Sequence, residues 1–287
     1  MSRPHFSPRP ARAAVLAPIL VLLTALLTGA TQPSVAGTAL PAGTSAAKPT
    51  VVLVHGAFAD ASGWNDVAAS LAAKGYPVVA PPNPLRGLTS DTAYLETFLS
   101  TISGPIVLVG HSYGGAVITN AATGDPDVKA LVYVAAYALD EGENVAAANE
   151  LGGGHSDLLE HIVVRPYPGA PEGDGDVYVD PAAFRSIFAH DLPRAQTVAM
   201  AAGQRPATFG ALVTPSAEPA WRTVPSWYLI AGDDHLIPPL AQAAMAERAG
   251  ARTRTVDSSH VAMMSHPRAT TEMILQAAYA TSRSGRP

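Results

Sequence analysis

Short apolar runs alternate with amphipathic stretches along most of this chain, and the alternation predicts its elements. Six runs are continuous in apolar or β-branched residues, as in strands covered on both faces. They span residues 50–56, 76–81, 105–112, 128–137, 226–232 and 253–257. Helical spacing occupies residues 61–75, 91–102, 113–123, 238–250 and 267–282. Strands that alternate with helices predict an α/β fold with a mostly parallel six-stranded sheet and helices on both faces.

Two residues mark expected helix ends. Gly75 follows the first amphipathic stretch and is a candidate C-terminal cap. Asp91 begins the second stretch and is a candidate N-terminal cap.

The rhythm breaks at about residues 140–223, where Gly- and Pro-rich pieces separate helical stretches. An insertion between the fourth and fifth strands is the simplest explanation. It would form a helical lid over the carboxyl edge of the sheet, where open α/β sheets bind ligands. Its larger aromatic residues are candidates for an apolar pocket lining: Phe184, Phe188, Phe209 and Trp221.

The amino-terminal segment is typical of a secretory signal peptide. Three arginines without acidic residues precede an apolar stretch at 13–30, and small residues end at Ala30 and Ala36. We expect cleavage after one of these alanines; an uncleaved membrane anchor is the alternative, because the apolar run is near the lower limit for spanning. No Arg-Arg pair is present, which favours the general secretory route.

These features predict a signal peptide at 1–36, a disordered leader at 37–49, a folded domain at 50–282 and a tail at 283–287. The 287 residues are 48% hydrophobic and 14% charged, which suits one domain with a large core. The formal net charge of −5 has no block of like charges, so nucleic acid is not an expected partner. Without cysteine, the chain can form neither disulfides nor a lipid-modified cysteine.

A serine between glycines is the strongest chemical signal. Residues 110–114 read Gly-His-Ser-Tyr-Gly, directly after an apolar strand and before a helix of small residues. This is the context of a nucleophile elbow, in which a tight strand-to-helix turn lifts Ser112 above the sheet. Gly110 and Gly114 would let the strand and helix approach closely.

A serine hydroxyl needs a base, and the base needs an orienting carboxylate, in chain order serine, acid, histidine. Asp233 and Asp234 follow the fifth strand, and His260 follows the sixth. Parallel strands bring these ends to the same edge as Ser112. The two adjacent aspartates cannot both face His260, so either remains a candidate.

The other histidines are expected to have structural roles or to lie on the protein surface. His235 is too close in sequence to the acid to be oriented by it, and His266 precedes a proline at a helix start. His111 would pack under the elbow. The lid contains three further histidines: His155, His161 and His190.

Ester chemistry at Ser112 would also require two donors for an oxyanion. The backbone N–H of Tyr113 supplies one candidate, and that of Ala57, in the loop after the first strand, supplies the other. Gly56 would let this loop turn in tightly, and His55 would brace it.

Three segments together carry a family resemblance: "VLVHGAFADASGW", "VGHSYGG" and "SHVAMMSHP". They resemble the α/β-hydrolase superfamily over about residues 50–282, most closely its compact branch of plant methylesterases, hydroxynitrile lyases and bacterial small-ester hydrolases. Alignment of "GDDHLIPP" with the family's acid loop places the acid at Asp234 and leaves Asp233 as the alternative. The lyases have a hydroxyl-bearing residue at the position of Gly56 and a lysine at that of Val261, so the chain looks like an esterase.

The resemblance implies a serine hydrolase that cleaves carboxylic esters with Ser112, His260 and Asp234 and needs neither metal nor organic cofactor. The amino-terminal segment predicts that this enzyme is secreted. The Gly-Asp-Gly-Asp stretch at 173–176 lacks the further ligands of a calcium loop. Alternatives are a lactonase, a thioesterase or a cofactor-free peroxidase with the same triad, or a non-catalytic ligand-binding protein. No stable membrane insertion is expected after cleavage, and the sequence does not predict an oligomeric state.

Overall fold

The computed structural model describes residues 48–284, with side chains to residue 281. The predicted signal peptide, most of the predicted leader and the end of the tail lie outside the described residues.

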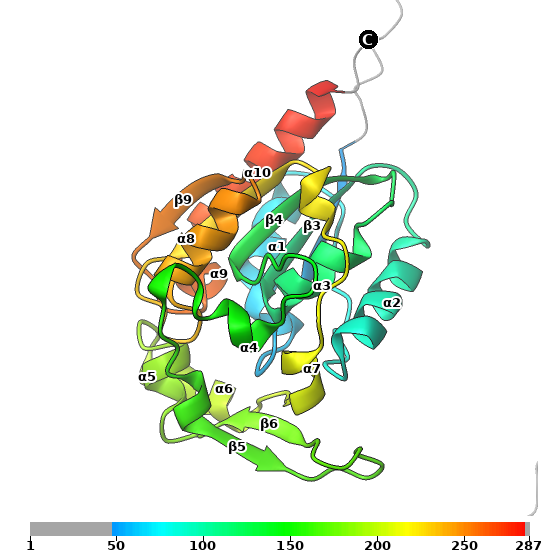
Figure 1. Cartoon of the computed structure of the whole chain (residues 1–287). Coiled ribbons are helices and arrows are strands. Elements are labelled where there is room, and N and C mark those ends of the chain that lie inside the picture. Colours follow the sequence, from blue (N-terminus) through cyan, green and yellow to red (C-terminus); the bar gives the residue numbers. More distant parts are fainter. Residues whose placement is uncertain (1–47, 285–287) are drawn as a thin grey trace, which may run out of the picture. The chain divides into compact units, whose positions relative to one another are not determined.

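Six strands form one parallel sheet at the centre of the domain, as the sequence predicts (Figure 1). In spatial order they are β2 (Val78–Val79), β1 (Thr50–Val54), β3 (Ile106–Ser112), β4 (Val128–Ala136), β8 (Ser226–Ala231) and β9 (Arg252–Val256). β3 and β4 lie in the middle, and every residue of β3 is buried. The central position of β3 explains its unbroken apolar run.

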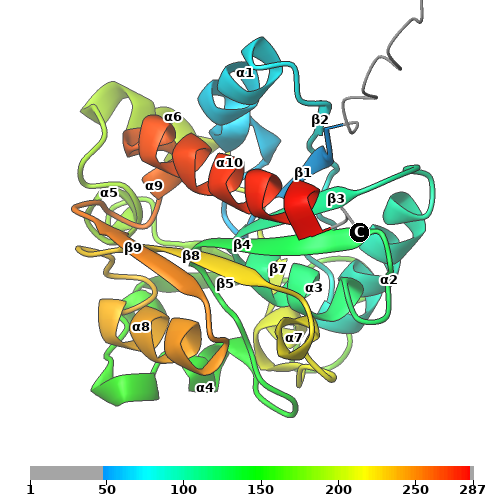
Figure 2. The same cartoon turned by 90° about the horizontal axis from the view of Figure 1, so that it is seen from above.

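Helices cover both faces of this sheet (Figure 2). α1 (Asn65–Ala73) and α10 (Pro267–Ser284) lie on one face, with the short α9 (Ala262–Ser265) beside them. α2 (Leu88–Leu99), α3 (Tyr113–Ala121) and α8 (Pro239–Arg248) lie on the other. Among residues 48–284, no helix has both the length and the apolarity needed to cross a bilayer.

The two predicted helix caps have different outcomes. Gly75 follows α1 with φ of +75° and donates its N–H to the Ala72 carbonyl, which confirms it as a helix terminator. The prediction for Asp91 is wrong, because α2 already begins at Leu88, after Gly87. Asp91 lies in the first turn, where its carboxylate accepts N–H groups of Arg86 and Gly87 from the preceding loop.

The segment between β4 and β8 contains short elements near one end of the main sheet (Figure 1). Its helices are α4 (Val145–Ala148), α5 (Phe184–Phe188), α6 (Arg194–Ala202) and α7 (Phe209–Val213), with 3₁₀ turns at Leu151–Gly153, Leu158–His161 and Ala220–Arg222. A small antiparallel sheet of β5 (Ile162–Arg165), β6 (Asp176–Val179) and β7 (Ala207–Thr208) accompanies them. The sequence does not predict this sheet, because strands of two to four residues have too little periodicity.

Candidate active site

The turn from β3 into α3 holds Ser112 in an unusual backbone conformation. Its φ of 52° and ψ of −126° lie outside the regions that side-chain-bearing residues normally adopt, and the turn is buried. Two glycines make this turn possible. A Cβ on Gly114 would lie 2.5 Å from the Val54 carbonyl oxygen, and one on Gly110 would lie 2.7 Å from that of Gly114. The strand and helix therefore approach as closely as the sequence predicts.

The loop after β1 passes directly over Ser112. A Cβ on Gly56 would lie 2.6 Å from the Ser112 Cβ, so only glycine fits there. His55 holds this loop: its Nε2 accepts the Asn83 N–H at 3.0 Å, and its Nδ1 lies 2.9 Å from the Gly56 carbonyl oxygen. This arrangement fixes the proton on Nδ1, and burial lowers the pKa of His55, so the ring is neutral at pH 7.

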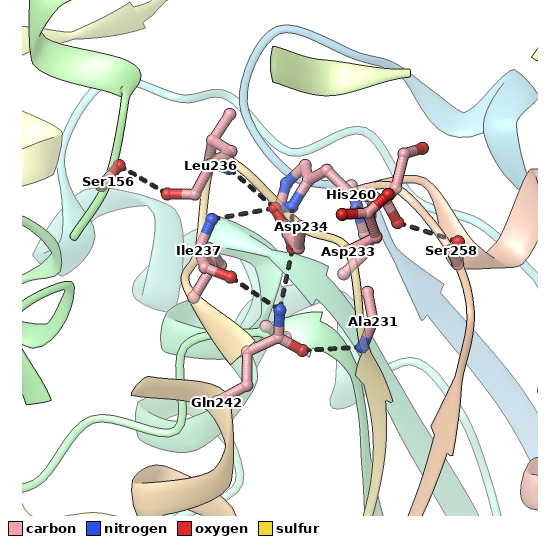
Figure 3. A network of polar contacts seen from close by, with 12 residues as sticks. Ser156, Ala231, Asp233, Asp234, Leu236, Ile237, Gln242, Ser258 and His260 are labelled. Carbon is pink, nitrogen blue, oxygen red and sulfur yellow. Dashed lines mark hydrogen bonds and ion pairs between the residues drawn. The ribbon is translucent and has the colours of Figure 1, made fainter. Parts of the chain in front are cut away.

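Asp234 and His260 form a buried pair (Figure 3). The Oδ2 atom of Asp234 lies 2.7 Å from Nδ1 of His260 and accepts the Gln242 side-chain N–H at 2.9 Å. Its Oδ1 accepts the N–H groups of Leu236 and Ile237 at 2.8 and 3.0 Å. With four donors on one carboxylate, the position of Asp234 is fixed.

The second ring nitrogen of His260, Nε2, points to no hydrogen-bond partner among the described residues. Within the described part of the chain, Nε2 is buried and has no hydrogen-bond partner. A buried nitrogen without a hydrogen-bond partner costs stability, so its presence calls for a functional explanation. An imidazole held by Asp234 through Nδ1 leaves Nε2 available to take a proton.

His111 joins the elbow to the loop that carries His260. Its Nε2 lies 3.0 Å from the His260 carbonyl oxygen, and the two ring centroids are 4.7 Å apart. Burial holds the pKa of His111 well below its usual value, so the ring is neutral and donates from Nε2. The residue before Ser112 therefore contacts the residue proposed as its base.

Asp233, the alternative acid, has different surroundings. Its side chain is 55% exposed, and its carboxylate lies 3.4 Å from Nε2 of His190 and 3.6 Å from Nε2 of His235. Asp234, not Asp233, therefore contacts His260.

The two backbone groups expected to bind an oxyanion lie in buried residues beside the elbow. Ala57 is 3% exposed and Tyr113 1% exposed. Among the loop and turn hydrogen bonds of residues 48–284, none is donated by either backbone N–H. The Tyr113 hydroxyl donates to Asp91 at 2.8 Å, which fixes the first residue of α3.

The insertion contacts the site through Phe188. The Phe188 ring lies edge-on to His260, with centroids 5.1 Å apart, and also packs against Phe58. Phe184 stacks on Phe188, whereas Phe209 is partly exposed and Trp221 donates to the Leu139 carbonyl.

A mainly apolar pocket of about 230 Å³ lies between the loop after β1 and α6. Its lining includes Phe58, Ala59, Gly63, Ala199, Met200 and Met264. Since Phe58 contacts Phe188, which covers His260, the pocket adjoins the covered site.

Three residues support the site in roles that the sequence does not predict. Gln242 on α8 holds Asp234, Asp91 holds Tyr113, and Asp191 accepts the Ser259 N–H at 3.0 Å next to His260. Their partners are 8, 22 and 68 residues away along the chain, and no motif marks any of these contacts.

Comparison with known proteins gives both sequence relatives and structural neighbours. A carbendazim hydrolyzing esterase of Nocardioides sp. (strain SG-4G) is 32% identical over 133 residues, which are 38% of this chain and 55% of that enzyme. The chain thus matches about half the length of that relative. An α/β hydrolase of Aspergillus novofumigatus (strain IBT 16806) is 26% identical over 254 residues, 80% of this chain and 97% of that protein.

Two solved structures have the same fold at low sequence identity. A pyrethroid hydrolase from Sphingobium faniae JZ-2 has a TM-score of 0.66 and 23% identity, over 82% of this chain and 99% of that one. A polyneuridine aldehyde esterase has a TM-score of 0.69 and 20% identity, over 80% and 98%. The sequence profile of the α/β hydrolase family matches residues 51–273. With its parallel sheet and buried strand-to-helix turn, the chain therefore belongs to the α/β hydrolase family.

Proposed function

We propose that this protein is a serine hydrolase of small carboxylic esters. The observation that carries the proposal is the buried pair of Asp234 and His260, with a free Nε2, beside the strained turn at Ser112. The names of the relatives, which include a carbendazim hydrolyzing esterase and a pyrethroid hydrolase, support ester hydrolysis as the reaction class.

In the proposed reaction, the Ser112 hydroxyl attacks the ester carbonyl carbon while Nε2 of His260 takes its proton. Asp234 keeps the ring in the required tautomer and stabilises the imidazolium. The backbone N–H groups of Ala57 and Tyr113 stabilise the tetrahedral oxyanion. The imidazolium protonates the departing alcohol, which leaves an acyl-Ser112. Water, deprotonated by His260, then releases the acid and restores the serine.

Hydrolysis of p-nitrophenyl acetate tests this mechanism. Replacement of Ser112 by Ala should reduce kcat by a factor of at least about 10⁴, because the nucleophile is lost. A Ser112→Ala protein that keeps its activity would exclude the mechanism. Circular dichroism on the same sample separates a chemical loss from unfolding.

Two matched variants test which aspartate orients His260. Asp234→Asn should lower kcat by at least about 100-fold, because the amide favours the wrong tautomer of His260. Asp233→Asn should change kcat less than threefold, since that carboxylate does not contact His260. Equal losses in both variants would reject Asp234 as the orienting acid.

The substrate pocket is proposed to bind an apolar ester group. Its lining by Phe58, Met200 and Met264 supports this preference. A series of p-nitrophenyl esters with increasing acyl length should show kcat/KM rising above that of acetate. A steady decline from acetate onward would argue against an apolar acyl site.

We also propose that the protein is exported and cleaved after Ala30 or Ala36. The basic, apolar and small-residue regions at the N-terminus support this route. Amino-terminal sequencing of protein from the culture medium should start at Thr31 or Gly37. Protein retained in the membrane with an intact N-terminus would instead indicate an uncleaved anchor.

A further inference from the structure

A second group of polar side chains surrounds the acid loop between β8 and α8. Asp233 and His235 flank Asp234 in sequence, and His190 approaches from the insertion, between α5 and α6. One nitrogen from each histidine and one oxygen from Asp233 all lie within 4.8 Å of one another. Two histidines and a carboxylate are a ligand set that zinc and similar divalent metals favour.

The distances within this group suit a shared ion better than direct hydrogen bonds between side chains. Nε2 of His190 lies 3.4 Å from the Asp233 carboxylate, and Nε2 of His235 lies 3.6 Å from it. Both exceed the usual N–H···O range of about 2.7–3.2 Å. Ligand atoms about 2.0–2.1 Å from a tetrahedral zinc ion are about 3.3 Å apart. The two separations are close to this value, although one ends on Oδ2 of Asp233 and the other on Oδ1. The His190 side chain is 25% exposed, whereas those of Asp233 and His235 are 55% and 46% exposed, so the latter two have room to rotate toward a shared ion.

The outer contacts of the group are also those of a metal site. A metal-bound histidine usually donates its other ring N–H to a carboxylate or carbonyl. Nδ1 of His235 faces the Asp157 carboxylate at 3.4 Å, which is longer than a hydrogen bond but is the position of such an orienting partner. The Asp157 N–H also donates to the His235 carbonyl at 3.1 Å. Nε2 of His190 lies 3.0 Å from the Asp233 backbone carbonyl, a contact that an ion would replace.

We propose that His190, Asp233 and His235 bind one Zn²⁺ ion, with Asp157 orienting His235 and water completing the coordination. The ion would fasten the insertion to the acid loop, because His190 and Asp233 are 43 residues apart. No step of ester hydrolysis passes through it. The neighbour of His190, Asp191, already binds the loop of His260 through Ser259, so the ion would stabilise the closed arrangement over the site.

Metal binding to the full protein, treated with EDTA and desalted, tests this site at pH 7.5. Equilibrium dialysis should show one Zn²⁺ per chain, and Co²⁺ should give the visible absorption bands of a tetrahedral site. His190→Ala and His235→Ala should weaken binding by at least 100-fold. His161→Ala, which removes a lid histidine outside the group, should leave it unchanged. Asp157→Asn should weaken binding about 10- to 100-fold, as expected for an orienting partner.

Thermal unfolding completes the test and controls for folding. Zn²⁺ at about a hundred times Kd should raise the Tm of the wild type by roughly 5 °C and leave that of His190→Ala unchanged. His190→Gln provides a second variant of similar size if alanine impairs folding. The site is rejected if no stoichiometric binding occurs at 100 µM Zn²⁺, or if the wild type and both histidine variants bind equally. The first result would mean an ion-pair cluster only, and the second a site elsewhere, such as His260.

Discussion

The carboxyl edge of the main sheet and the insertion above it are held together in different ways. At the sheet edge, Ser112, Asp234 and His260 are buried and positioned by backbone hydrogen bonds and glycine contacts. The insertion joins the rest of the domain partly through exposed ion pairs, such as Arg86–Asp176. The difference indicates that the geometry of the proposed catalytic residues is built into the sheet, whereas the cover over them is open to change in sequence and position.

The largest loss of stability is expected at the turn around Ser112, where the strand and the helix are in close contact. Gly114→Ala would place a Cβ 2.5 Å from the Val54 carbonyl oxygen, so the backbone of α3 or of β1 would have to shift. We expect a loss of at least about 3 kcal/mol in the free energy of unfolding, measured by urea denaturation. Gly203→Ala, at the end of α6 in the insertion, is the control, because its Cβ would make an ordinary 3.4 Å contact. Equal stability of the two variants would contradict the comparison.

Gln242 tests the polar support behind Asp234. Its amide oxygen accepts the Ala231 N–H, and its nitrogen donates to Asp234 and to the Ile237 carbonyl. Gln242→Leu leaves these buried groups unpaired and should cost about 1–3 kcal/mol of unfolding free energy. It should also lower kcat, since Asp234 loses a contact. Gln196→Leu, on the exposed side of α6, should alter neither quantity.

The buried histidines predict how stability depends on pH. The folded pKa of His111 is well below 6.5, so below pH 6.5 the unfolded chain binds a proton that the folded chain does not. Stability should therefore fall as pH decreases from 6.5, by about 1.4 kcal/mol per pH unit for each such histidine. His55 contributes in the same direction. In His111→Asn the slope, from urea denaturation at several pH values, should be smaller by one proton; an unchanged slope would mean that His111 is protonated in the folded state.

The smallest effect is expected in the insertion. Arg86 and Asp176 form a 2.6 Å ion pair whose side chains are 40% and 18% exposed. Solvent screens such pairs, so Asp176→Asn should cost less than about 1 kcal/mol in thermal or urea unfolding. A loss as large as that of Gln242→Leu would show that the insertion is held as firmly as the sheet edge.

The sequence predicts the sheet edge well because its signals are local. The apolar run before Ser112 and the glycines around it specify a strand, a turn and a helix within a dozen residues. The positions of Asp234 and His260 follow from the rule that parallel strands end at one edge. The choice between Asp233 and Asp234 required the family resemblance, because adjacent residues share every local signal.

The remaining features depend on tertiary contacts that no sequence pattern predicts. Gln242 meets Asp234 only because α8 folds back on its own loop. His190 and Asp233 meet only because the insertion closes over the acid loop, so the sequence alone does not connect His190 with His235. The small antiparallel sheet has strands too short for periodicity to reveal.

Labelling with a fluorophosphonate probe, followed by peptide mass spectrometry, tests the central claim most directly. Such probes react with a serine only where a base and an oxyanion site activate it. Ser62, which lines the neighbouring pocket, provides the control variant Ser62→Ala. We expect one adduct per chain on the peptide that contains Ser112, retained in Ser62→Ala and lost in Ser112→Ala. An adduct on another serine, or no adduct on a folded wild-type protein, would contradict it.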